Sequence, residues 1–199
     1  MKYQLSLYAL MICFFVNAQT VVDDFETGVL ESTLITTSEP SNYFQKGNTI
    51  IGQARHIKIH LDKNPFGQSF QITIRDGLLA VTAPYDTRGT FSLAYGKISK
   101  NKAAPLKLDV GTHTHLYIRF AAKSTINGFY AMLYSVNSRA VFGKQLPAKE
   151  GAFEFAVPLS DFKKIGTDFR LSQIDGIRFQ FDSRSKTGCS MAIDGIWFE

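Results

Sequence analysis

Short runs of alternating apolar and polar residues recur along most of this chain. Ile57, Ile59 and Leu61 alternate with polar neighbours. Side chains of a β-strand point alternately to its two faces, so such a run predicts a strand with one buried face. Further runs of this kind are Phe70, Ile72 and Ile74; Leu79 and Val81; Phe91, Leu93 and Tyr95; Leu116, Ile118 and Phe120; and Phe153, Phe155 and Val157.

Turn signals separate these runs. Asn64-Pro65-Phe66-Gly67 indicates a turn, and Asp76-Gly77 predicts a tight hairpin. Residues 159–162 predict a single helical turn. The run 126–136 has apolar residues at both odd and even positions, so its buried face cannot be assigned from the sequence. About ten short strands with turn signals every 8–12 residues are typical of an all-β sandwich or barrel.

The C-terminal residues 171–199 predict the strands that complete the fold. The tetrapeptide Ile-Asp-Gly-Ile opens two long runs, at 174–177 and at 193–196. The polar segment 182–188 lies between them, so the two runs are expected to form a terminal hairpin. The inward rows are rich in Phe and Ile, which suits two sheets packed face to face at ~10 Å.

The N-terminal residues have the composition of a secretory signal peptide. Lys2 precedes a mostly apolar stretch from Leu5 to Val16, and Ala18 supplies the small residue expected at a cleavage site. The apolar stretch is shorter than the ~20 residues of a membrane-spanning helix. We therefore expect a signal peptide at 1–18, a single domain at 19–199, and secretion to the periplasm or the exterior.

Cysteine content and net charge limit the kinds of bond and partner to be expected. Removal of residues 1–18 leaves Cys189 as the single cysteine, which predicts a buried thiol in the last strand; an intermolecular or reactive thiol is the alternative. The formal net charge of +5 falls to +4 without Lys2 and is spread along the chain. No nucleic-acid-binding motif occurs, so no nucleic-acid partner is expected.

The densest basic group occupies a loop. It consists of Lys97, Lys100, Lys102 and Lys107, with Pro105 among them. A solvated loop is the favoured interpretation, and a site for an acidic polysaccharide or a membrane surface is the weaker one.

Three segments resemble a known superfamily. Asp-Asp-Phe-Glu-x-Gly at 23–28, Phe-Ala-Val-Pro-Leu-Ser-Asp-Phe at 155–162 and the two Ile-Asp-Gly-Ile strands resemble the first, middle and last strands of galactose-binding-like jelly rolls. This superfamily includes carbohydrate-binding modules and the domain of complex I intermediate-associated proteins. The resemblance implies an all-β jelly-roll β-sandwich of two antiparallel sheets, and a secreted, non-catalytic domain that binds a polysaccharide. Residues 30–150 resemble no family we can name.

The same resemblance implies a structural calcium ion. Many such modules hold Ca²⁺ between the first and last strands, and Asp24, Glu26 and Asp194 occupy the matching positions. Calcium takes six to eight oxygen ligands, carboxylates among them. Gly195 stands where related modules often carry a second acid. The alternative is that the acids at 23–26 form a solvated edge and Asp194 lies at a β-bulge.

The candidate ligand-binding residues have the chemistry of a sugar site. His115, Tyr117 and Arg119 form the outward row of one strand, and Arg178 and Gln180 form that of the penultimate strand. Aromatic rings stack on the apolar faces of sugars, while Arg and Gln supply hydrogen bonds in fixed geometry. Further aromatic contacts are expected from Tyr43, Tyr85 and Tyr130. An ordinary polar outer face is the alternative.

Two other functional classes stay open. A jelly-roll polysaccharide lyase would use His115 and Tyr117 to move protons and Arg119 to neutralise a uronate. A structural or adhesive domain of the cell envelope would bind a protein partner instead. An enzyme is the less favoured class, because no catalytic motif such as Gly-x-Ser-x-Gly occurs.

Overall fold

The computed structural model describes residues 19–98, 103–122, 128–147, 149, 151–183 and 188–199. The predicted signal peptide at 1–18 lies outside these residues, as do Lys100 and Lys102. Within this part of the chain, no helix is long and apolar enough to cross a membrane.

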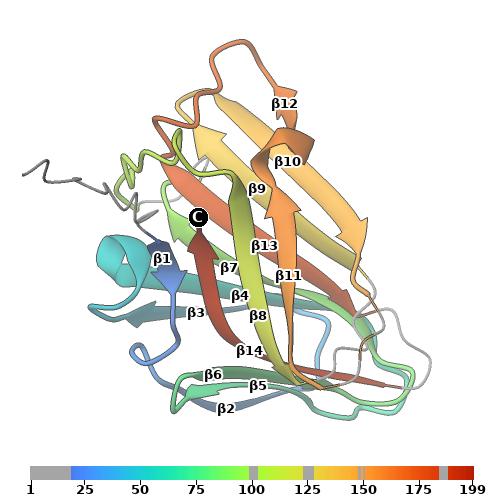
Figure 1. The fold of residues 1–199 in the computed structure, drawn as a ribbon. Helices are drawn as coiled ribbons and strands as arrows, with labels where there is room; N and C mark the ends of the chain where they lie inside the picture. The colour runs from blue at the N-terminus through green and yellow to red at the C-terminus, as the bar shows by residue number, and fades with distance from the viewer. Residues whose placement is uncertain (1–18, 99–102, 123–127, 148, 150, 184–187) are drawn as a thin grey trace, which may run out of the picture.

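The chain folds into two antiparallel sheets (Figure 1). We name each sheet after one of the two C-terminal strands. The β14 sheet contains, in order, β11 (Phe153–Pro158), β8 (His115–Ala122), β14 (Cys189–Phe198), β6 (Leu78–Ala83), β5 (Phe70–Arg75) and β2 (Leu30–Ile35), with β1 (Thr20–Asp23) paired to β14. The β13 sheet contains, in order, β12 (Lys163–Ile165), β10 (Ser138–Gln145), β9 (Gly128–Ser135), β13 (Gly176–Ser183), β7 (Arg88–Gly96), β4 (Ala54–Lys63) and β3 (Ser41–Lys46).

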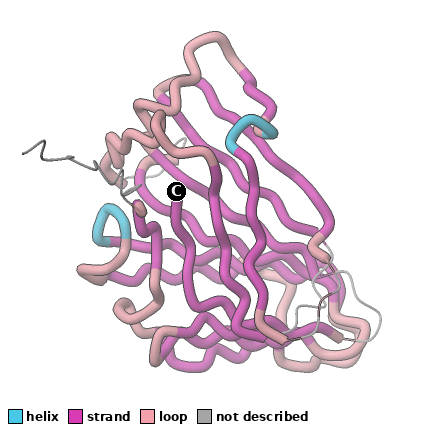
Figure 2. Tube along the Cα trace, viewed as in Figure 1, coloured by secondary structure: helices cyan, strands magenta, loops and turns pink. Residues whose placement is uncertain are grey.

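Helical structure is confined to two short 3₁₀ segments among the described residues (Figure 2). These are η1 (Ile51–Gln53) and η2 (Leu159–Asp161). The second confirms the helical turn predicted at 159–162. The architecture is that of the expected jelly-roll β-sandwich.

The predicted inward rows form the core between the sheets. Ile57, Ile59 and Leu61 of β4 are buried, as is the matching row of β8. The structure also assigns the faces of β9, where Phe129, Ala131 and Leu133 point inward. Aromatic rings join the layers: Phe129 of the β13 sheet meets Phe155 of the β14 sheet edge to face, with ring centroids 5.7 Å apart.

The predicted terminal hairpin is wrong. Strands β13 and β14 belong to different sheets: β13 pairs with β7 and β9, and β14 pairs with β1, β6 and β8. Both strands have an apolar inward row, Ile177 to Phe181 in β13 and Met191 to Phe198 in β14. When the two strands belong to different sheets, their apolar rows face each other across the interior and become buried. Strands paired side by side in one sheet would not cover each other in this way.

Two local predictions are confirmed. Arg75 pairs with Leu78, so Asp76 and Gly77 form the two-residue hairpin turn between β5 and β6. Both turn residues have positive φ, 52° and 72°, as a type I′ turn requires. The pairing of β14 with β8 shifts register between Ile193 and Gly195, which places Asp194 at a β-bulge.

Candidate functional site

The predicted row on β8 lies on the outward face of the β14 sheet, where its side chains contact one another and β14. The rings of Tyr117 and Trp197 stack with centroids 5.4 Å apart and an interplanar angle of 11°. Arg119 lies 5.6 Å from the Trp197 ring centroid, and its Nε is 2.7 Å from Asp194 Oδ1. His115 is 5.7 Å from the Tyr117 ring. The planar groups of this row are therefore engaged within the chain.

Arg178 and Gln180 lie on the other sheet. They belong to β13, whereas His115, Tyr117 and Arg119 belong to β8. The two sets point outward from opposite sides of the sandwich, because each is exposed on the side away from the shared core. The prediction that all five residues form one ligand face is therefore wrong, since alternation within a strand does not reveal which strands share a sheet.

The outward face of the β13 sheet brings other functional side chains beside Arg178 and Gln180. The strand registers align two rows across the sheet. In the first, Phe44, His56, Ala94, Arg178, Met132 and Val141 are successive partners from β3 to β10. In the second, the successive partners are Asn42, Lys58, Ser92, Gln180, Tyr130 and Gly143.

Strand β7 forms the floor of a trough across this face. Its outward side chains are small: Thr90, Ser92 and Ala94. The strands on either side, β4 and β13, carry long side chains such as Lys58 and Arg178. The small row between two taller rows leaves a depression, which we call the β7 trough.

Three hollows lie along this face. The β7 trough holds one of about 290 Å³, lined by Pro40, Lys58, His60, Thr90, Ser92, Arg178 and Gln180. A second, of about 450 Å³, lies between Phe44, His56 and the loop at 103–106. A third, of about 750 Å³, lies beside Tyr134 and Arg139. Pro105 lines both the second and the third. The second and third fall in the range of ~300–1,000 Å³ typical of ligand sites, and the first lies at its lower limit.

Two buried polar atoms of residues that line the trough lack a hydrogen-bond partner among the described residues. Arg178 Nε and His60 Nδ1 are buried and make no hydrogen bond with any described residue. His60 Nε2 lies 3.2 Å from Asp62 Oδ1. Burial lowers the pKa of His56, and the nearby charges of Arg178 and Lys58 lower it further. A polar ligand could accept a hydrogen bond from the unpaired Arg178 donor and offset the close positive charges.

Exposed aromatic rings flank the trough. Phe44 is 59% exposed and Tyr130 is 39% exposed. A Cβ on Gly143 would come within 2.8 Å of the Tyr130 ring, so this glycine gives the ring room to lie against the sheet. Of the three tyrosines from which the sequence predicts further aromatic contacts, Tyr130 lies on this face. Tyr43 instead packs against the core, and Tyr85 contacts Phe66 in the loop regions with ring centroids 6.3 Å apart.

Sequence reasoning missed His56, Lys58, His60 and Phe44 as site residues. The alternation in β4 does indicate that the first three share one outward face. Their proximity to Arg178 depends on β7 pairing with both β4 and β13, and no local pattern contains that pairing.

The acids of the predicted calcium site have separate partners. Asp24 Oδ1 accepts hydrogen bonds from Thr49 Oγ1 at 2.6 Å and from the Glu26 amide at 3.0 Å. Asp194 is paired with Arg119. In the described parts of the chain, no group of three His, Cys, Asp or Glu residues is placed to hold a metal ion. Asp24, Glu26 and Asp194 therefore do not form a common donor set, and calcium stays a prediction.

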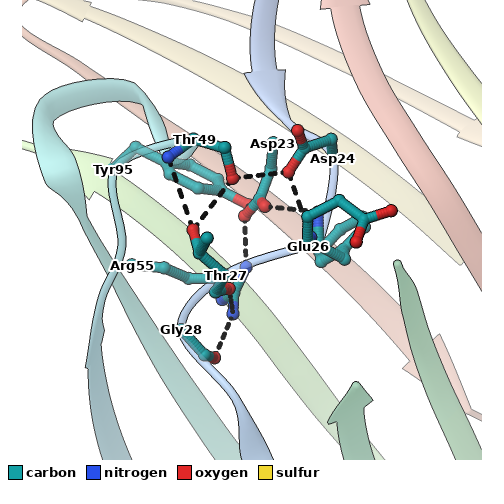
Figure 3. A network of polar contacts seen from close by, with 9 residues as sticks. Asp23, Asp24, Glu26, Thr27, Gly28, Thr49, Arg55 and Tyr95 are labelled. Atoms are coloured by element: carbon teal, nitrogen blue, oxygen red, sulfur yellow. Dashed lines mark hydrogen bonds and ion pairs between the residues drawn. The ribbon is translucent and has the colours of Figure 1, made fainter. Parts of the chain in front are cut away.

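Asp23, in contrast, is fully buried in a polar network that joins the sheets (Figure 3). Its carboxylate pairs with Arg55 of β4 and accepts a hydrogen bond from the Tyr95 hydroxyl at 2.7 Å. The Phe25 amide donates to its other oxygen at 3.0 Å, and Arg55 Nη2 donates to the Gly28 carbonyl at 2.7 Å. The expectation of a solvated acidic edge is wrong for this residue.

Cys189 is buried near the start of β14, as predicted. Burial raises the pKa of its thiol to about 11. The thiolate is the reactive form, so a thiol with this pKa is almost entirely protonated at neutral pH and is a poor nucleophile.

Comparisons with known proteins find similarity in structure alone. No protein-family model matches the chain, and no curated protein matches its sequence. A family 11 carbohydrate-binding module from Clostridium thermocellum, in complex with a β-1,3-1,4-mixed-linked tetrasaccharide, has 13% identity and a TM-score of 0.42, with 90% of this chain and 94% of that chain covered. The family 11 module of a cellulosomal cellulase of Clostridium thermocellum has 15% identity and a TM-score of 0.43, with 91% and 94% covered.

A third similar structure is a family 28 module specific for non-crystalline cellulose. It has 10% identity and a TM-score of 0.40, with 71% of this chain and 80% of that chain covered. These three similar structures are carbohydrate-binding modules, the class that the sequence resemblance named; the similar structures also include an exo-β-agarase and the enzymatically active domain of a bacteriophage tailspike protein. At these identities and TM-scores the likeness assigns no ligand to this chain.

Proposed function

We propose that this protein is a non-catalytic carbohydrate-binding domain whose ligand lies in the β7 trough. The observation that carries the proposal is the make-up of the trough. Its floor is the small row of β7, its walls present Arg178, Gln180 and Lys58, and the exposed rings of Phe44 and Tyr130 flank it. A sugar has apolar C–H faces and a ring of hydroxyls, so rings for stacking and planar hydrogen-bonding groups suit it.

The dimensions of the face suit a chain of sugars. Phe44 on β3 and Tyr130 on β9 are separated by four strand spacings, or ~19 Å. Hollows lie on both sides of the loop at 103–106, which suits an extended ligand with several sugar units in contact. The signal peptide predicted at 1–18 supports a site of action outside the cytoplasm, where polysaccharides occur.

The test fills the trough with a larger side chain. Ser92→Leu places a branched apolar group on the floor between Lys58 and Gln180, and Thr82→Leu makes the same change on the outward face of the β14 sheet. In a glycan-array screen followed by titration calorimetry, Ser92→Leu should weaken binding by at least about tenfold, the effect of one lost strong contact. Thr82→Leu should bind as the unaltered protein does.

The outcomes separate the two faces. Both variants should keep their melting temperature, because both side chains point away from the core. Unchanged affinity in Ser92→Leu would contradict the proposal. Loss of binding in Tyr117→Ala or Arg119→Ala would place the ligand on the β14 sheet instead. No binding across the array would favour the structural or adhesive alternative and direct the search to a protein partner.

A second candidate function is a polysaccharide lyase, favoured by one observation. His60, Arg178 and Gln180 line one hollow, Tyr130 is the strand partner of Gln180, and Asp62 contacts the His60 ring. In this reaction Arg and Gln would neutralise a uronate carboxylate, a base would remove the proton beside it, and the glycosidic oxygen would leave with a proton. Formation of unsaturated products from a bound uronate polymer would support this candidate over a binding domain.

A further inference from the structure

The hollow in the β7 trough is lined by basic side chains. Lys58 and His60 come from β4, and Arg178 comes from β13. None of the described residues that line this hollow is acidic. The two strands lie two spacings apart, or ~10 Å, so that Lys58 and Arg178 face the same small volume from opposite walls.

Asp182 of β13 lies beside this hollow and accepts a hydrogen bond from Gln180 Nε2 at 3.5 Å, but it forms no ion pair with the two cations. Neither Lys58 nor Arg178 forms an ion pair with any residue that the structure describes. The acid on the same face of β4, Asp62, contacts His60. Positive charges held close together repel each other, and an anion between them converts that repulsion into attraction.

An unpaired donor points to the same chemistry. Arg178 Nε is buried without a hydrogen-bond acceptor among the described residues. A guanidinium presents its N–H groups in a fixed fork that matches the two oxygens of a carboxylate or sulfate. The lowered pKa of His56 is consistent with uncompensated positive charge here, since Arg178 and Lys58 both contribute to it after burial.

We propose that the β7 trough recognises an acidic polysaccharide, with Arg178 and Lys58 binding a carboxylate or sulfate group carried by the sugar chain. This inference rests on the proposed function and names the ligand class of the same site. Gln180, on the same wall as Arg178, and Ser92, on the floor, contact the neighbouring hydroxyls of the same sugar unit.

The test compares polymers that differ in charge alone. Polygalacturonate and its methyl-esterified form share one backbone, as do dextran sulfate and dextran. The protein should bind at least one charged polymer about tenfold or more tightly than its uncharged partner, the ratio expected from one charge-assisted hydrogen bond. The first pair identifies a carboxylate as the recognised group and the second identifies a sulfate. Added salt should weaken binding to the charged polymer.

Three variants assign the effect to the trough. Arg178→Gln should reduce affinity for the charged polymer about tenfold and bring it close to that of the uncharged partner. Arg178→Lys should recover part of the loss, because it restores the charge without the fork. Arg75→Gln is the matched control: it removes one positive charge from an exposed side chain of β5, on the outward face of the opposite sheet. It should leave the affinity unchanged.

Each contrary outcome has a definite meaning. Equal affinity for charged and uncharged polymers would overturn the inference and leave glycan binding intact. Equal losses in Arg75→Gln and Arg178→Gln would also overturn it, since attraction would then come from net charge alone. Binding of a neutral array glycan without binding of any of the four polymers would overturn it too. Absence of binding to every glycan would overturn the proposed function as well. Melting temperatures establish that each variant is folded.

Discussion

At the scale of the residue, chemistry in this protein depends on the neighbours that the fold supplies. His56 is half-buried on β4 and has Phe44 on one side, at a ring distance of 6.5 Å. Lys58 on its own strand and Arg178 on β13 both disfavour its charged form. The sequence shows a histidine in an alternating strand, but the shift in its pKa comes from burial and from a strand more than 100 residues away.

This shift predicts a pH dependence of stability. The pKa of His56 is about 6.5 in the unfolded chain and lower in the folded protein. The unfolded state therefore binds more protons between the folded-state pKa and about pH 6.5. As far as His56 is concerned, the free energy of unfolding is highest above about pH 6.5 and decreases as the pH falls through the folded-state pKa. His56→Gln should show a smaller decrease in melting temperature between about pH 7 and pH 5 than the unaltered protein, measured by thermal unfolding in matched buffers.

A second variant checks the cause. Lys58→Gln removes one of the charges that lowers the pKa, so its pH dependence should fall between those of the unaltered protein and His56→Gln. If His56→Gln lost stability with falling pH as steeply as the unaltered protein, other groups would account for the effect.

At the scale of the element, the last strand has two different roles along its length. Its first half pairs with β6, and its second half lies between β8 and β1. The bulge at Asp194 separates these halves and turns its carboxylate toward Arg119. The glycine after Asp194 allowed the bulge to be predicted, but the repeated Ile-Asp-Gly-Ile sequence did not reveal that its two copies belong to different sheets.

The sequence predicts a calcium ion at the junction of β1 and β14, and thermal unfolding tests this prediction. If a calcium ion links Asp24, Glu26 and Asp194, EDTA should lower the melting temperature by several degrees, because a ligand bound only to the folded state stabilises it. Calcium added in excess should restore the original value, and Asp24→Asn should abolish the response. An unchanged melting temperature in EDTA would contradict the prediction and would agree with the Arg119 partner of Asp194.

At the scale of the whole molecule, the two sheets are joined by one buried polar network as well as by the apolar core. Asp23 belongs to the β14 sheet, while Arg55 and Tyr95 belong to the β13 sheet. Both members of the ion pair are fully buried. A buried charge without its partner is strongly destabilising, since it has lost its water without compensation.

Removal of one partner should therefore be costly. Arg55→Met should lower the free energy of unfolding by about 3–5 kcal/mol, measured by chemical denaturation. The double variant Asp23→Asn with Arg55→Met should lose less than the sum of the two single variants, because the uncompensated charge is gone. Arg119→Met is the matched control at the exposed pair with Asp194, where the expected cost is about 0–1 kcal/mol. A similar cost at both sites would contradict the role of burial.

The sequence alone determined the alternating strands, their buried faces and the all-β class, because each depends on a period of two within a few residues; the faces of the run at 126–136 were left to the structure. It also determined the turn at Asp76-Gly77 and the buried state of Cys189. It singled out Arg178, Gln180 and Tyr130 by the chemistry of their side chains, and these three lie on one outward face. These features are local, so no knowledge of distant residues was needed to predict them.

Only the tertiary structure decided which residues act together. Strand pairing placed Arg178 across β7 from His56, in the row next to that of Lys58, separated it from Tyr117 and Arg119, and put β13 and β14 in different sheets. It also paired Asp23 with Arg55, two residues whose sequence positions gave no sign of contact. The alternating pattern is the same whichever strands become neighbours, so the composition of a face spanning several strands is set by the pairing of the whole chain.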